Sequence, residues 1–224
     1  MVSKNQPHKI TLDFINHIQN GEKRVATFLG HNIIIHNNVF PVDSPFSFSS
    51  KVTAKNIPKN SKLVLDIGTG TGVQAIVAAK NGAKKVIAID IDDNSLINAK
   101  ENISYHNLNK IIELRKSNLF DNIKKDEKFD LIISQLPFAD INYESKVSHF
   151  LFDNNFELHD RLLKNAKNHL NTNGKILIPS GEVANEKKLI ELIRKYDYKI
   201  LEIKSETFQN LVWKLYILTF DDKN

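Results

Sequence analysis

The chain has 224 residues, of which 41% are hydrophobic, with a formal net charge of +5 and a pI of about 9.2. This length and apolar content predict one main domain with a sizeable core. The absence of cysteine excludes a disulfide framework and a thiolate metal site, and no apolar run is long enough to cross a membrane. Residues 1–8 lack the apolar core of a signal peptide, so we expect a cytoplasmic location.

The first quarter of the chain predicts a small extension that packs on the main domain. We interpret residues 1–57 as this extension and residues 58–224 as the main domain. The pattern of apolar and turn residues sets the expected elements. They are a helix over 10–19, a hairpin of 25–29 with 32–36 around Gly30 and His31, a proline-containing loop over 39–45 and a helix over 46–56.

From residue 62 onward the pattern alternates between strands and helices, which predicts an α/β fold with a parallel sheet and helices on both faces. Strands are expected over 62–67, 85–90, 110–116, 129–134 and 174–179, and helices over 72–81, 93–106, 155–170 and 185–195. Two final strands, 198–205 and 212–220, have no helix between them and should therefore pair antiparallel.

Residues 63–72 are the most informative segment. An apolar strand carries Asp66 near its end, and Gly68, Gly70 and Gly72 follow at every second position. Glycine allows close approach of the backbone to a ligand. The dinucleotide-binding pattern G-x-G-x-x-G needs its third glycine one residue later, and no Gly-Lys-Ser/Thr of a P-loop follows. The spacing thus disfavours a dehydrogenase, and the carboxylate favours a ligand with an amino group; the alternative is a tight turn without a ligand.

These residues resemble the first motif of the class I S-adenosylmethionine-dependent methyltransferases. The resemblance implies a Rossmann-like, mostly parallel sheet of seven strands whose last strand inserts antiparallel. It also implies S-adenosyl-L-methionine as cofactor, with Asp66 holding its amino end. The glycine loop would lie under the amino-acid part of the cofactor through Gly68, Thr69, Gly70 and Gly72.

Two further strand ends complete the expected cofactor site. Asp90 ends the second strand, where a carboxylate can accept hydrogen bonds from both ribose hydroxyls. Ile91 would lie against the adenine, and Asp93 is expected to cap the next helix. Asn118, followed by Leu119, stands where the family usually has an aspartate that touches the adenine amine. An asparagine keeps a carbonyl acceptor, although a loop residue without a ligand is the alternative.

The segment Gln135-Leu136-Pro137-Phe138 follows the fourth strand of the main domain. Methyltransferases of planar nitrogens carry Asn/Asp-Pro-Pro-Tyr/Phe at this place. There the first side chain and the next carbonyl accept the hydrogens of the amine, and the aromatic ring orients it. We predict Gln135, Pro137 and Phe138 as catalytic residues. The longer stem of Gln135 moves its amide oxygen, so either the acceptor sits farther out or the chemistry differs; a plain strand-end turn is the alternative.

The connection from 139 to 153 is long and is expected to form a lid over the acceptor pocket. It contains Tyr143, His149 and the apolar run 150–152. If the acceptor is a hydroxyl group, Asp140 or His149 could act as the base. No HExxH or similar ligand pattern occurs, so no metal site is predicted.

The leading hypothesis is therefore a methyltransferase related to the release-factor glutamine family, acting on a nitrogen of a protein side chain, an RNA base or a small molecule. The lead-in over residues 39–44 loosely resembles that family and the small-domain ribosomal RNA guanine methyltransferases. The net positive charge permits an RNA partner, but it is mostly scattered lysine. The alternatives are a biosynthetic small-molecule O-, N- or C-methyltransferase and a non-catalytic S-adenosylmethionine-binding protein. We expect a monomer or homodimer without membrane attachment.

Overall fold

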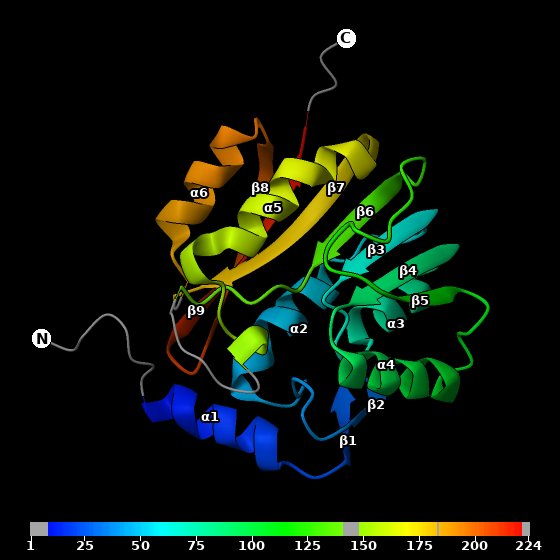
Figure 1. Cartoon of the computed structure of the whole chain (residues 1–224), viewed down its shortest axis with the longest axis vertical. Coiled ribbons are helices and arrows are strands. Elements are labelled where there is room, and N and C mark those ends of the chain that lie inside the picture. Colours follow the sequence, from blue (N-terminus) through cyan, green and yellow to red (C-terminus); the bar gives the residue numbers. More distant parts are fainter. Residues whose placement is uncertain (1–8, 141–147, 183, 221–224) are drawn as a thin grey trace, which may run out of the picture.

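A computed structural model describes residues 9–140, 148–182 and 184–220 of the chain. Its centre is a seven-stranded sheet in the order β5-β4-β3-β6-β7-β9-β8 (Figure 1). β9 lies between β7 and β8 and is antiparallel to both, while the β5 to β7 pairs are parallel. This confirms the predicted mostly parallel sheet with an inserted antiparallel last strand. The strands are β3 (Leu63–Ile67), β4 (Lys85–Asp90), β5 (Ile112–Lys116), β6 (Phe129–Ser134), β7 (Leu170–Gly181), β8 (Lys199–Phe208) and β9 (Leu211–Thr219).

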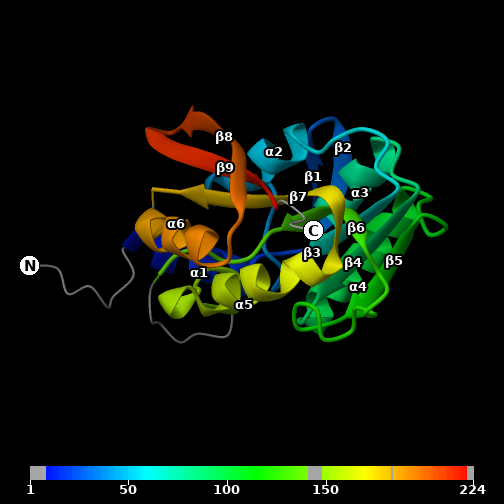
Figure 2. The same cartoon turned by 90° about the horizontal axis from the view of Figure 1, so that it is seen from above.

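Helices cover both faces of the sheet because the central strands are apolar on both sides. Val64 and Val86 face one core, whereas Leu65 and Ile87 face the other, as the alternation of side chains along a strand requires. α2 (Phe48–Lys55), α3 (Val73–Lys80) and α4 (Asp93–Tyr105) contribute to the first core, and α5 (Glu157–Ala166) and α6 (Glu186–Lys195) to the second. Figure 2 shows α5 and α6 on the opposite side of the sheet from α2 and α3.

The N-terminal segment forms α1 (Lys9–Asn20) and a hairpin of β1 (Arg24–Phe28) and β2 (His31–Ile35). The expected turn at Gly30 and His31 is wrong by one residue. Phe28 pairs with His31, so Leu29 and Gly30 form the turn, with φ angles of 47° and 82°. A two-residue hairpin turn of this kind needs positive φ at both positions.

Two asparagines of α4 hold the hairpin against the main domain. Asn98 and Asn102 are fully buried, and their side chains bond the backbone of β2. The Ile34 amide donates to Asn102 Oδ1 at 2.8 Å, and Asn102 Nδ2 also donates to the Thr71 carbonyl at 2.9 Å. Asn102 therefore connects the N-terminal hairpin with the glycine loop. The boundary between an extension and a main domain at residue 57 stays an interpretation.

Two of the helices differ from the sequence-based expectation, α4 in its capping residue and the helix expected over 155–170 in its continuity. Asp92, not Asp93, caps α4, because Asp92 Oδ2 accepts from the Ser95 amide at 2.7 Å and Asp93 is already helical. The expected helix over 155–170 is divided into a 3-10 turn, α5 and a second 3-10 turn. Among the described residues, none of the helices has the length and hydrophobicity needed to traverse a lipid bilayer.

Candidate active site

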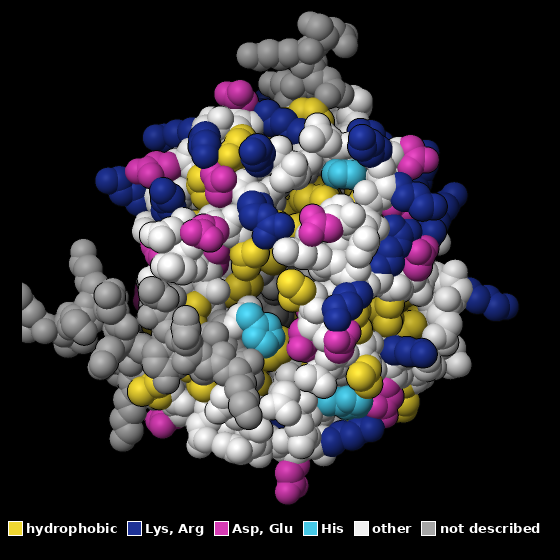
Figure 3. All heavy atoms as spheres, viewed as in Figure 1, with side chains coloured by type: hydrophobic (Ala, Val, Ile, Leu, Met, Phe, Trp, Pro, Cys, Tyr) yellow, Lys and Arg dark blue, Asp and Glu magenta, His cyan; other side chains and the backbone are white. Residues whose placement is uncertain are grey.

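A cavity of about 600 Å³ opens where the parallel strands end. Such a volume is typical of small-molecule sites, and open α/β sheets bind ligands at this edge. Figure 3 shows a hollow on one face of the molecule, bordered by hydrophobic side chains. The predicted residues that line the cavity come from four strand ends; they are Gly68, Thr69, Gly70, Asp90, Ile91, Asn118, Leu119, Gln135, Pro137 and Phe138.

Each glycine of the loop after β3 has a separate role. Gly68 has a φ of +72°, and a Cβ there would lie 2.9 Å from the Gln135 carbonyl oxygen. Gly70 has a φ of +54°, and a Cβ there would have nothing within 4 Å, so its open side faces the cavity that it lines. Gly72 does not line the cavity; it caps α3 and lies against Ala99. Gly68 thus brings the predicted cofactor and acceptor segments into direct contact.

Asp66 lies beneath the glycine loop and does not line the cavity. Its Oδ2 accepts from Thr69 Oγ1 at 2.7 Å and from the Ala75 amide at 3.1 Å. Its Oδ1 is buried and has no hydrogen-bond partner among the described residues. Burial raises the pKa of Asp66 to about 7. A buried carboxylate oxygen without a partner fits a ligand that brings positive charge, directly or through water.

Asp90 ends β4 at the wall of the cavity, where it is 8% exposed. Its Oδ2 accepts from the Gly70 amide at 2.9 Å and its Oδ1 from the Asp92 amide at 3.0 Å. Each carboxylate oxygen keeps a second lone pair, so the two oxygens can still accept one hydrogen bond each from two hydroxyl groups. Burial raises the pKa of Asp90, and the neighbouring Ile91 is 55% exposed, as an apolar surface for a ligand requires.

The loop after β5 forms the third wall. Ser117 donates its amide to the Asp90 carbonyl at 2.9 Å and its Oγ to the Leu119 carbonyl at 2.8 Å. Leu119 has a positive φ of 53°, and both Asn118 and Leu119 line the cavity. The prediction placed these two residues at the ligand without foreseeing that Ser117 shapes the turn.

The acceptor segment begins at the end of β6. The Gln135 amide donates to the Ile67 carbonyl at 2.9 Å, which fixes the segment beside the glycine loop. Gln135 Oε1 accepts from Ser50 Oγ at 3.1 Å, and Gln135 Nε2 is buried without a partner in the described part of the chain. The Phe138 ring lies edge-on to Trp213, with centroids 6.4 Å apart.

Several cavity residues were missed because nothing in their local sequence marks them. Gln74 follows the glycine loop in the first turn of α3, and Ser50 comes from α2. Trp213 comes from β9, and Phe14 comes from α1. Phe40, which belongs to the lead-in over residues 39–44, and Phe46 also line the cavity.

The described part of the connection after Phe138 forms the rim of the cavity. Residues 150–152 line it and pack in a small apolar cluster with Phe14. His149 also lines it, whereas Tyr143 lies outside the described residues. Asp140, the other suggested base, is not among the residues that line the cavity, and its role stays a prediction. Its two oxygens accept from the Asn155 amide at 2.8 Å and from Asn185 Nδ2 at 2.9 Å.

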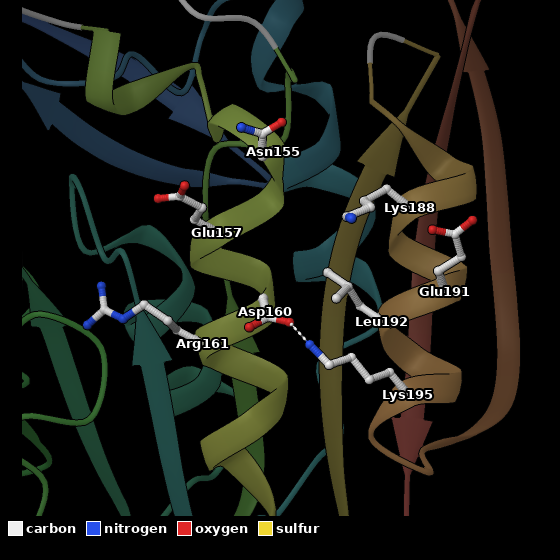
Figure 4. A pocket seen from close by; sticks show the side chains of 8 residues that line it. All are labelled: Asn155, Glu157, Asp160, Arg161, Lys188, Glu191, Leu192 and Lys195. Carbon is white, nitrogen blue, oxygen red and sulfur yellow. Dashed lines mark hydrogen bonds and ion pairs between the residues drawn. The ribbon is translucent and has the colours of Figure 1, made fainter.

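A second hollow of about 590 Å³ lies between α5 and α6. Figure 4 shows charged side chains along it, including Asp160 and Lys195, which form an ion pair at 2.7 Å. Arg161 points away from this pair and also lines the rim of the main cavity (Figure 4). None of the residues that line this hollow comes from the end of a strand, so we do not take it as the candidate active site. No cluster of potential metal ligands occurs among the described residues.

Comparison with known proteins agrees with this geometry. The family model described as "Methyltransferase small domain" matches residues 30–204. A protein of Methanocaldococcus jannaschii whose name proposes it as a protein N5-glutamine methyltransferase is 31% identical over 179 residues, covering 76% of this chain and 86% of that protein. The ribosomal protein L11 methyltransferase of Lactobacillus johnsonii is 36% identical over 137 residues, covering 61% of this chain. The match spans only 37% of that relative's length.

Solved structures share the fold. A ribosomal protein L11 methylase from Lactobacillus delbrueckii subsp. bulgaricus has a TM-score of 0.61 at 23% identity, with 81% of each chain covered. The tRNA m1G37 methyltransferase of M. jannaschii has a TM-score of 0.64 at 20% identity, covering 91% of this chain and 56% of that chain. At these identities the likeness concerns the fold alone.

Proposed function

The chain belongs to the methyltransferase small-domain family, whose cofactor is S-adenosyl-L-methionine, and we propose that it methylates the side-chain amide nitrogen of a protein glutamine. One observation carries the proposal. The glycine loop and Gln135–Phe138 line a single cavity, and the two segments lie so close that a Cβ at Gly68 would be 2.9 Å from the Gln135 carbonyl oxygen. The N5-glutamine methyltransferase name of the M. jannaschii relative, which is matched over most of its length, supports this choice of acceptor.

The residues present fit the cofactor. Thr69 and Gly70 line the cavity, and the hydroxyl of Thr69 donates to the buried carboxyl group of Asp66. Asp90 would hold the ribose, and Ile91 and Asn118 would enclose the adenine. S-adenosylmethionine supplies an electrophilic methyl group on a sulfonium sulfur. Because that methyl is already reactive, the protein's remaining task is to orient the acceptor nitrogen.

The acceptor wall is suited to a neutral planar group. Gln135, Gln74 and Ser50 offer amide and hydroxyl groups, and Phe138 and Trp213 provide aromatic surface. An amide nitrogen is a poor nucleophile because its lone pair is delocalised, so hydrogen bonds that draw on its N–H groups would favour the reacting geometry. A hydroxyl acceptor would need a base, and His149 is the candidate base that lines the cavity, whereas the two oxygens of Asp140 are engaged by Asn155 and Asn185.

The first test is calorimetric titration with S-adenosylmethionine, with NAD and NADP in parallel. We expect binding of S-adenosylmethionine alone. Radiolabelled cofactor is then offered to pools of short synthetic peptides with a central glutamine, asparagine, lysine or glutamate, and to a total RNA pool. Label in the glutamine pool, with N5-methylglutamine found by mass spectrometry, is the expected result. Label in RNA or in the lysine pool, or binding of a nicotinamide cofactor, would contradict the proposal.

A cytoplasmic location and a monomeric or homodimeric state belong to the same proposal. Fractionation of cells and sedimentation of the purified protein at several concentrations would test them. Because the chain spans only part of its L11 methyltransferase relatives, the test uses the glutamine peptides rather than one chosen protein substrate.

A further inference from the structure

We propose that Gln74 is the residue that accepts a hydrogen bond from the N–H of the methyl-accepting amide, and that Ser50 positions it together with Gln135. This inference rests on the proposed function, because it assigns the acceptor wall of the same cavity. It concerns a residue outside the Gln135–Phe138 segment, on the helix that follows the glycine loop.

The orientation of the Gln74 amide is fixed by its surroundings. Gln74 is 1% exposed, and its Nε2 donates to the Ser50 backbone carbonyl at 2.9 Å. A carbonyl can only accept, so the nitrogen of the amide must face Ser50 and the oxygen must face the other way. Gln74 Oε1 is buried and has no hydrogen-bond partner among the described residues, and Gln74 is one of the residues that line the cavity. A buried acceptor without a partner at a cavity wall indicates a ligand donor.

Ser50 connects this amide to the acceptor segment. Its carbonyl holds Gln74, and its Oγ donates to Gln135 Oε1 at 3.1 Å. Gln135 Nε2 is then the free end of that side chain, buried and without a partner in the described residues. The wall therefore presents the fixed acceptor of Gln74 beside the amide of Gln135, whose free end is the donor Nε2 when Ser50 donates to its oxygen. This pair matches the N–H and C=O of a primary carboxamide.

This division of roles explains the departure at position 135. The family pattern assigns the accepting oxygen to the side chain at this position. Here that oxygen is engaged by Ser50, and the extra methylene of glutamine extends the amide toward α2. Gln74 then supplies the accepting oxygen from α3. A third buried donor without a partner in the described chain, Trp213 Nε1, lies on the same cavity and could share the substrate carbonyl.

A purely structural role for Gln74 would be a tether between α3 and the N-terminal segment. The chain offers a matched example of such a tether. Asn81, at the C-cap of α3, donates its Nδ2 to the Ile57 carbonyl at 3.0 Å. Asn81 does not line the cavity, and its side-chain oxygen is not among the buried atoms without partners in the described chain. Removing the side-chain amide of Gln74 and, separately, that of Asn81 distinguishes a loss of substrate contact from the loss of a structural tether.

The test compares Gln74→Met with the control Asn81→Leu in protein loaded with S-adenosylhomocysteine. The probes are a glutamine peptide and the same peptide with glutamate γ-methyl ester, which lacks the N–H. Wild type and Asn81→Leu should bind the glutamine peptide about tenfold more tightly than the ester, and Gln74→Met should lose this preference. A wild-type protein without the preference, or a Gln74→Met variant that keeps it, would overturn the inference.

Kinetics supply the second readout. Gln74→Met should lower kcat/KM for the glutamine peptide by about tenfold or more, with the KM for S-adenosylmethionine within about twofold of wild type. A rise in the cofactor KM instead would mean that Gln74 contacts the cofactor and would overturn the assignment. If wild type shows the binding preference but transfers no methyl group to the peptide, the proposed function fails while the hydrogen-bonding role of Gln74 stands.

Discussion

Replacement of Asp66 by asparagine should stabilise the ligand-free protein at alkaline pH and leave it nearly unchanged at acidic pH. Burial raises the pKa of Asp66 from 3.8 to about 7, so the folded state keeps a proton that the unfolded chain releases. Stability must then fall as the pH rises from about 4 to about 7, because the unfolded state binds fewer protons. The loss is about 1.4 kcal/mol per pH unit between the two pKa values and levels off above pH 7, so it comes to about 2.7 kcal/mol between pH 5 and pH 8.

The asparagine side chain has no ionisable group, so the Asp66→Asn variant would escape this loss. Thermal unfolding of both proteins at about pH 5 and pH 8 measures the difference. For a chain of this length, about 2.7 kcal/mol corresponds to a relative gain of about 5–10 °C for Asp66→Asn at the higher pH. The same substitution should weaken binding of S-adenosylmethionine, since the amino end of the cofactor loses its carboxylate.

Asp130→Asn is the matched control because its pKa shifts the other way. Asp130 Oδ2 accepts from the amides of Lys62 and Leu63, and the pKa of Asp130 lies below its ordinary value. Its stabilising contribution is complete above the unfolded pKa, so it is equal at pH 5 and pH 8. Asp130→Asn should therefore lower the melting temperature by the same amount at both. A pH-independent effect of Asp66→Asn would refute the reasoning on its burial.

Three other substitutions test the site. Gly68→Ala should lower the free energy of unfolding by about 2 kcal/mol or more and abolish cofactor binding, because the new Cβ meets a backbone oxygen at 2.9 Å. Gly30→Ala has a similar φ but open space, so it should lower the free energy of unfolding by only about 1 kcal/mol and leave binding intact. Thermal melts measure the stability of both variants, and calorimetry measures their cofactor binding. Asp90→Asn should weaken S-adenosylmethionine binding about tenfold in a folded protein, and unchanged affinity in a titration would remove the ribose assignment. Asn102→Leu should cost about 2–5 kcal/mol in chemical denaturation, since it leaves the Ile34 amide without its acceptor, although Asn98 still donates to the Ile34 carbonyl. A loss below about 1 kcal/mol would show that the hairpin docks by other contacts.

The succession of strands along the chain, and the grouping of most of the expected cofactor residues at one cavity, could be predicted because their signals are local. The run from Leu63 to Gly72 encodes a strand, a turn and a helix start within ten residues, and Asp90 follows its own strand directly. The carboxyl ends of parallel strands meet at one edge, so local patterns are enough to bring these residues together. The one-residue errors at the hairpin turn and at the cap of α4 arose because neighbouring residues can satisfy the same local preference.

The segment Gln135–Phe138 was predicted at the site, but its hydrogen bonds and the place of Gln74 could not be, because these contacts join distant parts of the chain. Ser50 and Gln135 are 85 positions apart, and Ser50 and Gln74 are 24 apart, with no local pattern that pairs them. Taken by itself, Gln135 differs from the asparagine of the family pattern only by one added methylene group. Beside Ser50 it becomes one end of a three-residue arrangement in which Ser50 of helix α2 bonds both amides. The unusual residue at position 135 and the N-terminal segment are then a single feature. A substitution at Gln135 or at Ser50 should therefore change which nitrogen is methylated more than it changes the affinity for the cofactor.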